Sequence, residues 1–290
     1  MTAPTPGIAE WARLVTASKV AAILGLSPWE SPFSMWLKMR GEIPAESGQN
    51  ADAKSRGHYL EDGIVRWWID QHPDAAVEGT QVYAERDGWA GSTPDAVATL
   101  TETGERVVVD AKTAAFGDEW GDEPPAYYQA QMVWQMWTHD ADAGYVAALL
   151  GPRLTLREFR IERDRDLEAA IVARCREFYD SLSLDTPPDL DDSVPTYEAV
   201  RALHPDIDRD ASVELTHDLA HEYVSAAVAF KEAETAERAA KARLLAAMGR
   251  ARLATFDGTT VARRQPRGEA VSLVRVAKYI SPPPPKEKTA

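Results

Sequence analysis

Two short stretches decide the fold of this chain, Gly91-Ser92-Thr93-Pro94-Asp95 and Val107-Val108-Val109-Asp110-Ala111-Lys112-Thr113. The three valines predict a buried strand, because β-branched residues favour strands. Residues i and i+2 of a strand point to the same face, so Asp110 and Lys112 are expected to project together. A hairpin over residues 101–104 would then return the chain so that Asp95 lies beside them.

This arrangement brings two carboxylates and one ammonium group into a small volume. Carboxylate oxygens are the ligands of Mg²⁺, and a lysine can orient a water molecule or balance developing charge. The pattern therefore indicates metal-assisted chemistry on a phosphodiester. A simpler interpretation is that Asp110 and Lys112 form an exposed ion pair on an edge strand.

A helix is expected from about Ser55 to Gln71, with Ile64 and Trp68 on its apolar side. Glu61 borders that side, and burying an unpaired carboxylate is costly. A metal ion shared with Asp95 and Asp110 would give Glu61 a partner. The alternative is an ordinary surface glutamate.

A short first helix is predicted between Thr16, as its N-cap, and Gly25. Its opening turn carries Thr16, Ser18 and Lys19, and helix N-termini favour phosphate groups. Capping alone explains Thr16, and the other two side chains could simply be solvated. The three residues are candidate phosphate contacts.

A later helix places Tyr128, Gln131 and Gln135 on one face at helical spacing. Neutral hydrogen-bonding groups in a line suit a nucleic-acid backbone or the wall of an active site. Tyr128 and Gln131 are therefore candidate DNA contacts, and Gln131 is also a candidate catalytic residue.

The composition is that of a chain able to bury a core, with 290 residues, 44% of them hydrophobic, and nine tryptophans. We expect an α/β fold with a central mixed sheet flanked by helices. The single cysteine, Cys175, excludes an internal disulfide and cysteine-held clusters. The sequence has no run of 18 apolar residues and no secretory signal, so we expect no membrane association and a cytoplasmic location.

Four segments are expected along the chain. A nuclease-like domain spans 10–185, a linker with Pro187 and Pro188 spans 186–211, a long helix followed by a basic β-hairpin spans 212–280, and a disordered tail spans 281–290. The helix carries apolar residues on one face, among them Leu219, Tyr223 and Phe230.

The net charge of −14 opposes DNA binding, but charge is unevenly distributed. From Arg250 onward there are nine basic and three acidic residues, a balance of +6, which leaves −20 for the rest. Arg263 and Arg264, in the predicted hairpin, are candidate DNA contacts.

The chain resembles the YqaJ-type viral recombinases, relatives of phage lambda exonuclease in the PD-(D/E)XK, or restriction-endonuclease-like, nuclease superfamily. The resemblance spans roughly Leu14 to Asp164. Its motifs occur in the family's order, and they are Val15-Thr16-Ala17-Ser18, Ile23-Leu24-Gly25-Leu26-Ser27-Pro28, Arg56-Gly57-His58-Tyr59-Leu60-Glu61, Ser92-Thr93-Pro94-Asp95, Asp110-Ala111-Lys112-Thr113 and Tyr128-x-x-Gln131.

The resemblance implies a 5′→3′ exonuclease that degrades double-stranded DNA ends with Mg²⁺ or Mn²⁺, two ions per site. It also implies a phage or prophage origin, a single-strand annealing protein as partner, and a homo-oligomer, a trimeric ring. By position, Glu61, Asp95, Asp110 and the Ala111 carbonyl would bind metal. Lys112 would position the attacking water, and Ser18 would lie near a terminal phosphate.

Two positions depart from the family pattern. Asp110 stands where glutamate is usual, and Val133 stands where a second glutamine is often found. Two other functions remain open, which are another DNA nuclease of this fold, such as an endonuclease or a RecB-like repair enzyme, and a DNA-end-binding protein without activity. The intact acid–acid–lysine set favours an enzyme over the latter.

Overall fold

The computed structural model describes residues 12–44, 51–115, 120–268 and 270–276, with the backbone alone for 51–54. It divides into two compact units, residues 1–207 and 208–290. The predicted tail, 281–290, lies outside the described residues.

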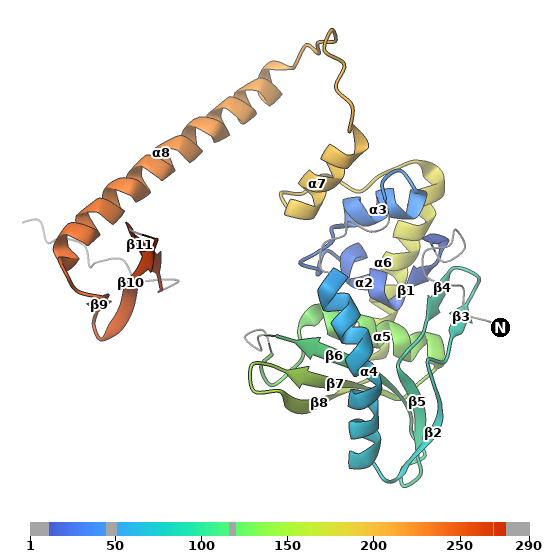
Figure 1. Cartoon of the computed structure of the whole chain (residues 1–290). Helices are drawn as coiled ribbons and strands as arrows, with labels where there is room; N and C mark the ends of the chain where they lie inside the picture. Colours follow the sequence, from blue (N-terminus) through green and yellow to red (C-terminus); the bar gives the residue numbers. More distant parts are fainter. Residues whose placement is uncertain (1–11, 45–50, 116–119, 269, 277–290) are drawn as a thin grey trace, which may run out of the picture. The chain divides into compact units, whose positions relative to one another are not determined.

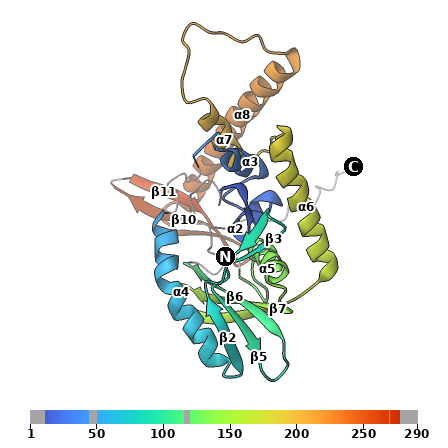
Figure 2. The same cartoon turned by 90° about the vertical axis from the view of Figure 1, so that its right-hand side faces the viewer.

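The centre of the first unit is a five-stranded sheet (Figures 1 and 2). Its strand order is β2-β5-β6-β7-β8. The strands are β2 (Ala75–Thr80), β5 (Ala96–Leu100), β6 (Arg106–Ala114), β7 (Ala143–Leu150) and β8 (Thr155–Glu162). Only the β6–β7 pair is parallel within this sheet, and a helix connects those two strands. The sheet is therefore mixed, as the sequence predicted.

Helices cover both faces of the sheet (Figure 2). On one face α4 (Ala51–Gln71) packs Ile64 and Trp68 against the side chains of Val107 and Val109. On the other face α5 (Ala126–His139) contributes to the core that contains Val108. Because side chains alternate along a strand, Asp110 and Lys112 share the face of Val108, beneath α5.

The N-terminal segment joins the core through a second, smaller sheet. It holds β1 (Val15–Thr16), β4 (Ala90–Ser92) and β3 (Ala84–Arg86), in the order β1-β4-β3. β1 runs parallel to β4, with Thr16 opposite Gly91. The pairing places the first-helix motif beside the strand that leads to Asp95. Helices α2 (Ala17–Ile23), α3 (Pro32–Arg40) and α6 (Arg165–Leu184) pack in the same core.

The expected linker contains a packed helix. α7 (Val194–Leu203) lies within 186–211, and its Thr196 is buried and donates a 2.6 Å hydrogen bond to the Ser31 hydroxyl. The Ser193 side chain caps the helix by accepting a hydrogen bond from the backbone N–H of Thr196. Pro195 suits the first turn, because proline has no N–H and the first N–H groups of a helix have no partner within it. The prediction of a linker was therefore wrong for these residues, because the two prolines and the acidic run precede a helix that docks on α3.

The second unit consists of a long helix and a three-stranded sheet. α8 (His217–Met248) is one continuous helix (Figure 1). The sheet has the order β11-β10-β9, with β9 (Leu253–Phe256), β10 (Thr259–Arg267) and β11 (Ala270–Arg275). β9 and β10 form the predicted hairpin, and β11 is a third strand that was not predicted.

The predicted class is confirmed, an α/β core with a mixed sheet flanked by helices and a C-terminal helix followed by a hairpin. Among the described residues, no helix is both long and apolar enough to span a membrane.

Candidate active site

Asp95 and Asp110 lie at the open end of the β5–β6 pair, where Ala96 is opposite Val109. Asp95 precedes β5, and its Oδ2 accepts a 2.7 Å hydrogen bond from the backbone N–H of Ala111. Its Oδ1 accepts a 2.7 Å bond from Gln81 Nε2. The predicted approach of Asp95 to the Asp110 strand is confirmed by this geometry.

Asp110 is buried, with 3% of its surface exposed, and three side-chain donors contact its carboxylate oxygens. Gln135 Nε2 donates to Oδ1 at 2.8 Å, and Gln131 Nε2 lies 3.3 and 3.2 Å from Oδ1 and Oδ2. Lys112 forms an ion pair with Oδ2. The alternative of an exposed pair on an edge strand is wrong, because β6 is an interior strand beneath α5.

The negative charges of the buried Asp110 and the half-buried Asp95 repel each other. Burial and the charge of Asp110, with a smaller effect of Glu61, raise the pKa of Asp95 to about 7. Burial opposes the charge on Lys112, but Asp110 and Asp95 outweigh it and raise the pKa of Lys112. Lys112 is therefore a protonated donor and not a base.

Glu61 lies at the edge of this site. It projects from α4, its carboxylate pairs with His58 Nδ1 at 3.3 Å, and it is close enough to influence the pKa of Asp95. In the described part of the chain, no three His, Cys, Asp or Glu side chains are grouped to hold a metal ion. Glu61 therefore lies near the two aspartates, but the three carboxylates are not grouped closely enough in this structure to form a three-ligand set.

The donor chemistry nevertheless fits a divalent cation. Two carboxylates with one ammonium leave excess negative charge, and burial together with the charge of Asp110 raises the pKa of Asp95. Hard cations such as Mg²⁺ take oxygen ligands of this kind and keep several waters. Asp95 and Asp110 would hold such an ion, with Glu61 and the Ala111 carbonyl as further candidates.

Thr16, Ser18 and Lys19, at the start of α2, lie in different environments. Thr16 is the N-cap residue, and its hydroxyl lies 3.1 Å from the Ser18 hydroxyl. Ser18 is exposed. Lys19 is 4% exposed and donates to the carbonyl oxygens of Ala12 and Leu14 at 2.9 and 2.7 Å, and burial lowers its pKa to about 7. This burial contradicts the expected phosphate contact of Lys19, which instead ties the chain to α2.

Tyr128 lines the site from α5. The Lys112 ammonium lies 5.2 Å from the centre of the Tyr128 ring, in a cation–π contact. Tyr128 thus contacts Lys112, and Gln131 contacts Asp110, the partner of Lys112 in the ion pair.

Two residues of the site were not among the predicted catalytic or metal-binding ones. Gln135 is 1% exposed and donates to Asp110. Its spacing from Gln131 was the available signal. Gln81 has a left-handed backbone, with φ of 53°, and donates to Asp95 from outside the motif. Nothing in the sequence around Gln81 indicates that role.

The two arginines of the C-terminal hairpin point to opposite faces of their sheet. Arg263 is exposed, whereas Arg264 is half-buried and its guanidinium donates to the carbonyl oxygen of Gly249. Neighbouring residues of a strand alternate in direction. The two arginines therefore do not share one surface, and Arg264 instead holds the end of α8 to the sheet.

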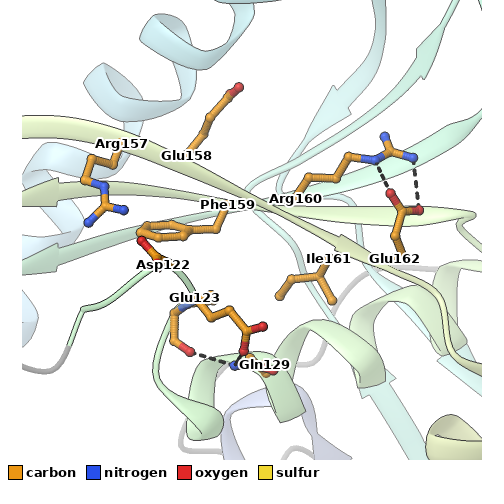
Figure 3. Close-up of a pocket in the computed structure, with 10 residues that line it drawn as sticks. Asp122, Glu123, Gln129, Arg157, Glu158, Phe159, Arg160, Ile161 and Glu162 are labelled. Atoms are coloured by element: carbon orange, nitrogen blue, oxygen red, sulfur yellow. Dashed lines mark hydrogen bonds and ion pairs between the residues drawn. The ribbon is translucent and has the colours of Figure 1, made fainter.

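A pocket of about 370 Å³ lies elsewhere, between β8 and the segment before α5 (Figure 3). Arg157, Phe159 and Arg160 line it, and Arg160 pairs with Glu162 at 2.6 Å. It contains none of the predicted site residues, so the candidate active site is defined by its carboxylates and not by a deep cavity.

Known proteins resemble part of this chain. The model of the YqaJ-like viral recombinase domain matches residues 10–145. The uncharacterized protein YqaJ of Bacillus subtilis is 26% identical over 208 residues, which are 70% of this chain and 64% of that protein. The chain thus spans less than two thirds of the length of this relative.

Two solved exonucleases are more distant. The alkaline exonuclease LHK-Exo of Laribacter hongkongensis is 20% identical, with a TM-score of 0.46 over 60% of this chain and 90% of that one. A phage-related exonuclease of Haemophilus somnus 129PT is 16% identical, with a TM-score of 0.44 over 59% of this chain and 96% of that one.

The family match covers α2 with Ser18, the β5–β6 pair with Asp110, Lys112 and the preceding Asp95, and α5 with Gln131. The mixed sheet carries Asp110 on β6 and holds Asp95, the residue before β5, against that strand. Residues 10–145 therefore resemble the YqaJ-like viral recombinase domain, as the motifs of the sequence predicted.

Proposed function

We propose that this protein is a divalent-metal-dependent deoxyribonuclease, an exonuclease that degrades one strand from double-stranded DNA ends in the 5′→3′ direction. The single observation that carries this proposal is the convergence of Asp95, Asp110 and Lys112 on one hairpin, fixed by the bond from Ala111 N–H to Asp95. The match to a viral recombinase domain supports the same class of reaction.

A bound Mg²⁺ or Mn²⁺ ion, or a pair of them, would act as a Lewis acid on the scissile phosphate and lower the pKa of a water molecule. Asp95 and Asp110 would hold the metal, supported by Glu61 and the carbonyl oxygen of Ala111. The hydrogen bonds from Gln81 and Gln135 fix the orientation of the two aspartates.

Lys112 would orient the attacking water and oppose negative charge that develops on the phosphate. Its raised pKa keeps it positively charged at neutral pH, which suits both tasks. Gln131 can offer an amide to a phosphate oxygen when it moves away from Asp110, since its present bonds of 3.2 and 3.3 Å are long.

The end of the DNA would be read near Ser18. The pairing of β1 with β4 supports this role, because Thr16 lies opposite Gly91, four residues before Asp95. A duplex with a 5′-phosphate should then be cut faster than one with a 5′-hydroxyl, and Ser18→Ala should remove the difference. Equal rates on both ends in the wild type would contradict this contact.

The proposal includes a phage or prophage setting inside the bacterial cell. The single strand that the exonuclease leaves would pass to a single-strand annealing protein for homologous recombination. A homo-oligomeric ring around the DNA, a trimer in the resemblance, would keep the enzyme on its substrate.

A linear duplex labelled at one 5′ end and, separately, at one 3′ end tests the reaction directly. With Mg²⁺, the 5′ label should be released first as mononucleotide, while EDTA should stop release. A covalently closed circle of the same sequence is the matched substrate and should stay intact. Cleavage of the circle would identify an endonuclease, and binding of ends without release would identify an inactive end-binding protein.

A further inference from the structure

The long helix α8 carries an apolar stripe that nothing in its own unit covers. Every residue from 221 to 243 is exposed within the described chain. The exposed fractions of the residue surface are 52% for Leu219, 73% for Tyr223 and 67% for Phe230. Large apolar side chains placed together on one helix face are costly to leave in water.

The stripe repeats with the spacing of a coiled coil. Steps of four and three residues alternate without a break from Leu219 to Ala247. Its members are Leu219, Tyr223, Ala226, Phe230, Ala233, Glu237, Ala240, Leu244 and Ala247. Glu237 interrupts the apolar run, and its carboxylate is paired with Lys241 one turn later at 2.9 Å. Seven-residue periodicity of this kind fits a partner helix better than a flat surface.

The charges of α8 separate along its length. From residue 217 to residue 237 there are five acids and one lysine, a balance of −4, whereas residues 238–248 carry three basic residues and no acid, +3. The helix dipole favours this polarity only within the first and last turns. Glu222 and Arg243 lie further in, so the dipole does not account for them.

We propose that α8 pairs with α8 of a second copy of this chain, in antiparallel orientation. This direction brings the acidic part of each helix against the basic part of the other. A parallel pair would set like charges side by side. The register that pairs eight of the nine stripe residues, from Leu219 to Leu244, places Leu219 of one copy opposite Leu244 of the other.

In the same register Tyr223 lies opposite Ala240 and Phe230 lies opposite Ala233, so that each ring fills the space left by a small residue. Ala226 faces Glu237, where Lys241 already neutralises the carboxylate. Beside the stripe, Glu222 of each copy meets Arg243 of the other. The pairing lies outside residues 10–145 and does not depend on the proposed nuclease reaction.

The mass of the full-length chain in solution tests the pairing. Wild type should have at least twice the mass of the 31.9 kDa chain by light scattering. The double variant Tyr223→Asp/Phe230→Asp should halve that mass at micromolar concentration. Val228→Asp is the matched control, since Val228 is exposed on the opposite side of the same helix and should keep the wild-type mass.

A monomeric wild type would overturn the proposal, because the stripe would then be covered within one chain or not at all. So would an oligomer whose mass the double variant leaves unchanged, because the contact would then lie elsewhere. Circular dichroism of the double variant checks that α8 remains helical.

Cysteine cross-linking tests the direction of the helices. Ala226→Cys and Glu237→Cys lie opposite each other in the antiparallel register, and both keep the large apolar side chains. A mixture of the two single variants should form a disulfide-linked dimer on mild oxidation, and neither variant alone should do so. In a dimer of one variant, the two identical cysteines would lie about 16 Å apart along the helix axis, given the helical rise. This distance is too long for a disulfide.

Cross-linking of each single variant with itself would indicate parallel helices and contradict the proposal. Cys175 is fully buried and does not compete in this reaction. A charge reversal adds a second check, since Glu222→Arg should weaken the dimer and Glu222→Arg/Arg243→Glu should restore it.

Discussion

Asp95 accepts a 2.7 Å hydrogen bond from the backbone N–H of Ala111, the residue between Asp110 and Lys112. An aspartate that stands before one strand is thereby fixed to the neighbouring strand that carries the other acid and the lysine. The bond uses a backbone donor, so it does not depend on the identity of residue 111. The relative position of the three charged groups follows from the pairing of β5 with β6.

Asp95→Asn should abolish cleavage, because an amide is a poor ligand for a hard cation. The substitution keeps the shape of the side chain and its acceptor oxygen. Mg²⁺ should raise the melting temperature of the wild type and leave that of Asp95→Asn unchanged, as thermal scans with and without the ion would measure. Asp87→Asn, on the turn between β3 and β4, is the control and should keep wild-type activity. Full activity in Asp95→Asn would remove Asp95 from the site.

The same residue predicts a pH dependence of stability in the absence of metal. The pKa of Asp95 rises from 3.8 in the unfolded chain to about 7 in the folded one. The folded state therefore holds more protons between these values, and this group's contribution to stability falls as pH increases from 4 to 7. Above 7 its destabilising effect is constant.

In EDTA, Asp95→Asn should thus be more stable than wild type at pH 8, by at least about 1 kcal/mol, since one pKa unit corresponds to about 1.4 kcal/mol. The difference should shrink towards pH 4. Urea titrations at several pH values measure it. A difference that stays constant across this range would mean that Asp95 is not the group that titrates.

Much of this site could be predicted from sequence because its chemistry is local to two strands. The i, i+2 spacing of Asp110 and Lys112 and the hairpin that returns to Asp95 are short-range features. The location of Glu61 relative to Asp95 depends on how α4 crosses the sheet, and Lys19 was misjudged because its burial depends on carbonyl groups at residues 12 and 14. Gln81 reaches Asp95 only through a left-handed turn that its residue type does not predict.

Lys112→Met should lower the rate of cleavage about 100-fold or more, the usual cost of removing a placed electrostatic group. Metal affinity should be unchanged or higher, because methionine removes a positive charge that competes for Asp110. Single-turnover cleavage and calorimetric titration of Mn²⁺ separate the two effects. A loss of Mn²⁺ affinity as large as that in Asp95→Asn would contradict the division of roles.

Gln135→Leu should reduce turnover by roughly 10-fold to 100-fold, the typical cost of removing a residue that orients a metal ligand. Gln135 is buried and its Nε2 donates to Asp110, while its side-chain Oε1 has no hydrogen-bond partner in the described residues, so the contact with Asp110 fixes its amide. Gln135→Glu should be more harmful, since it sets a second negative charge against Asp110.

Gln129→Leu is the matched control on the same helix, because Gln129 bonds to the carbonyl oxygen of Pro124, away from Asp110. It should keep wild-type turnover. If Gln135→Leu shifts only the melting temperature and leaves both turnover and Mn²⁺ affinity intact, Gln135 is a packing residue alone.

The last prediction concerns DNA contact by the C-terminal sheet. Arg263 and Arg267 are exposed and lie four residues apart on one face of β10, where the chain reverses its acidic balance. Each arginine that neutralises a phosphate contributes close to one unit to the slope of log affinity against log salt. Arg263→Ala/Arg267→Ala should therefore weaken binding to all duplexes similarly and flatten the slope by about two. Arg174→Ala is the control, since Arg174 is exposed on α6 and pairs with Glu177. An unchanged slope in the double variant would mean that Arg263 and Arg267 do not contact phosphates. The phosphate contacts would then come from other residues or from the bound metal ions.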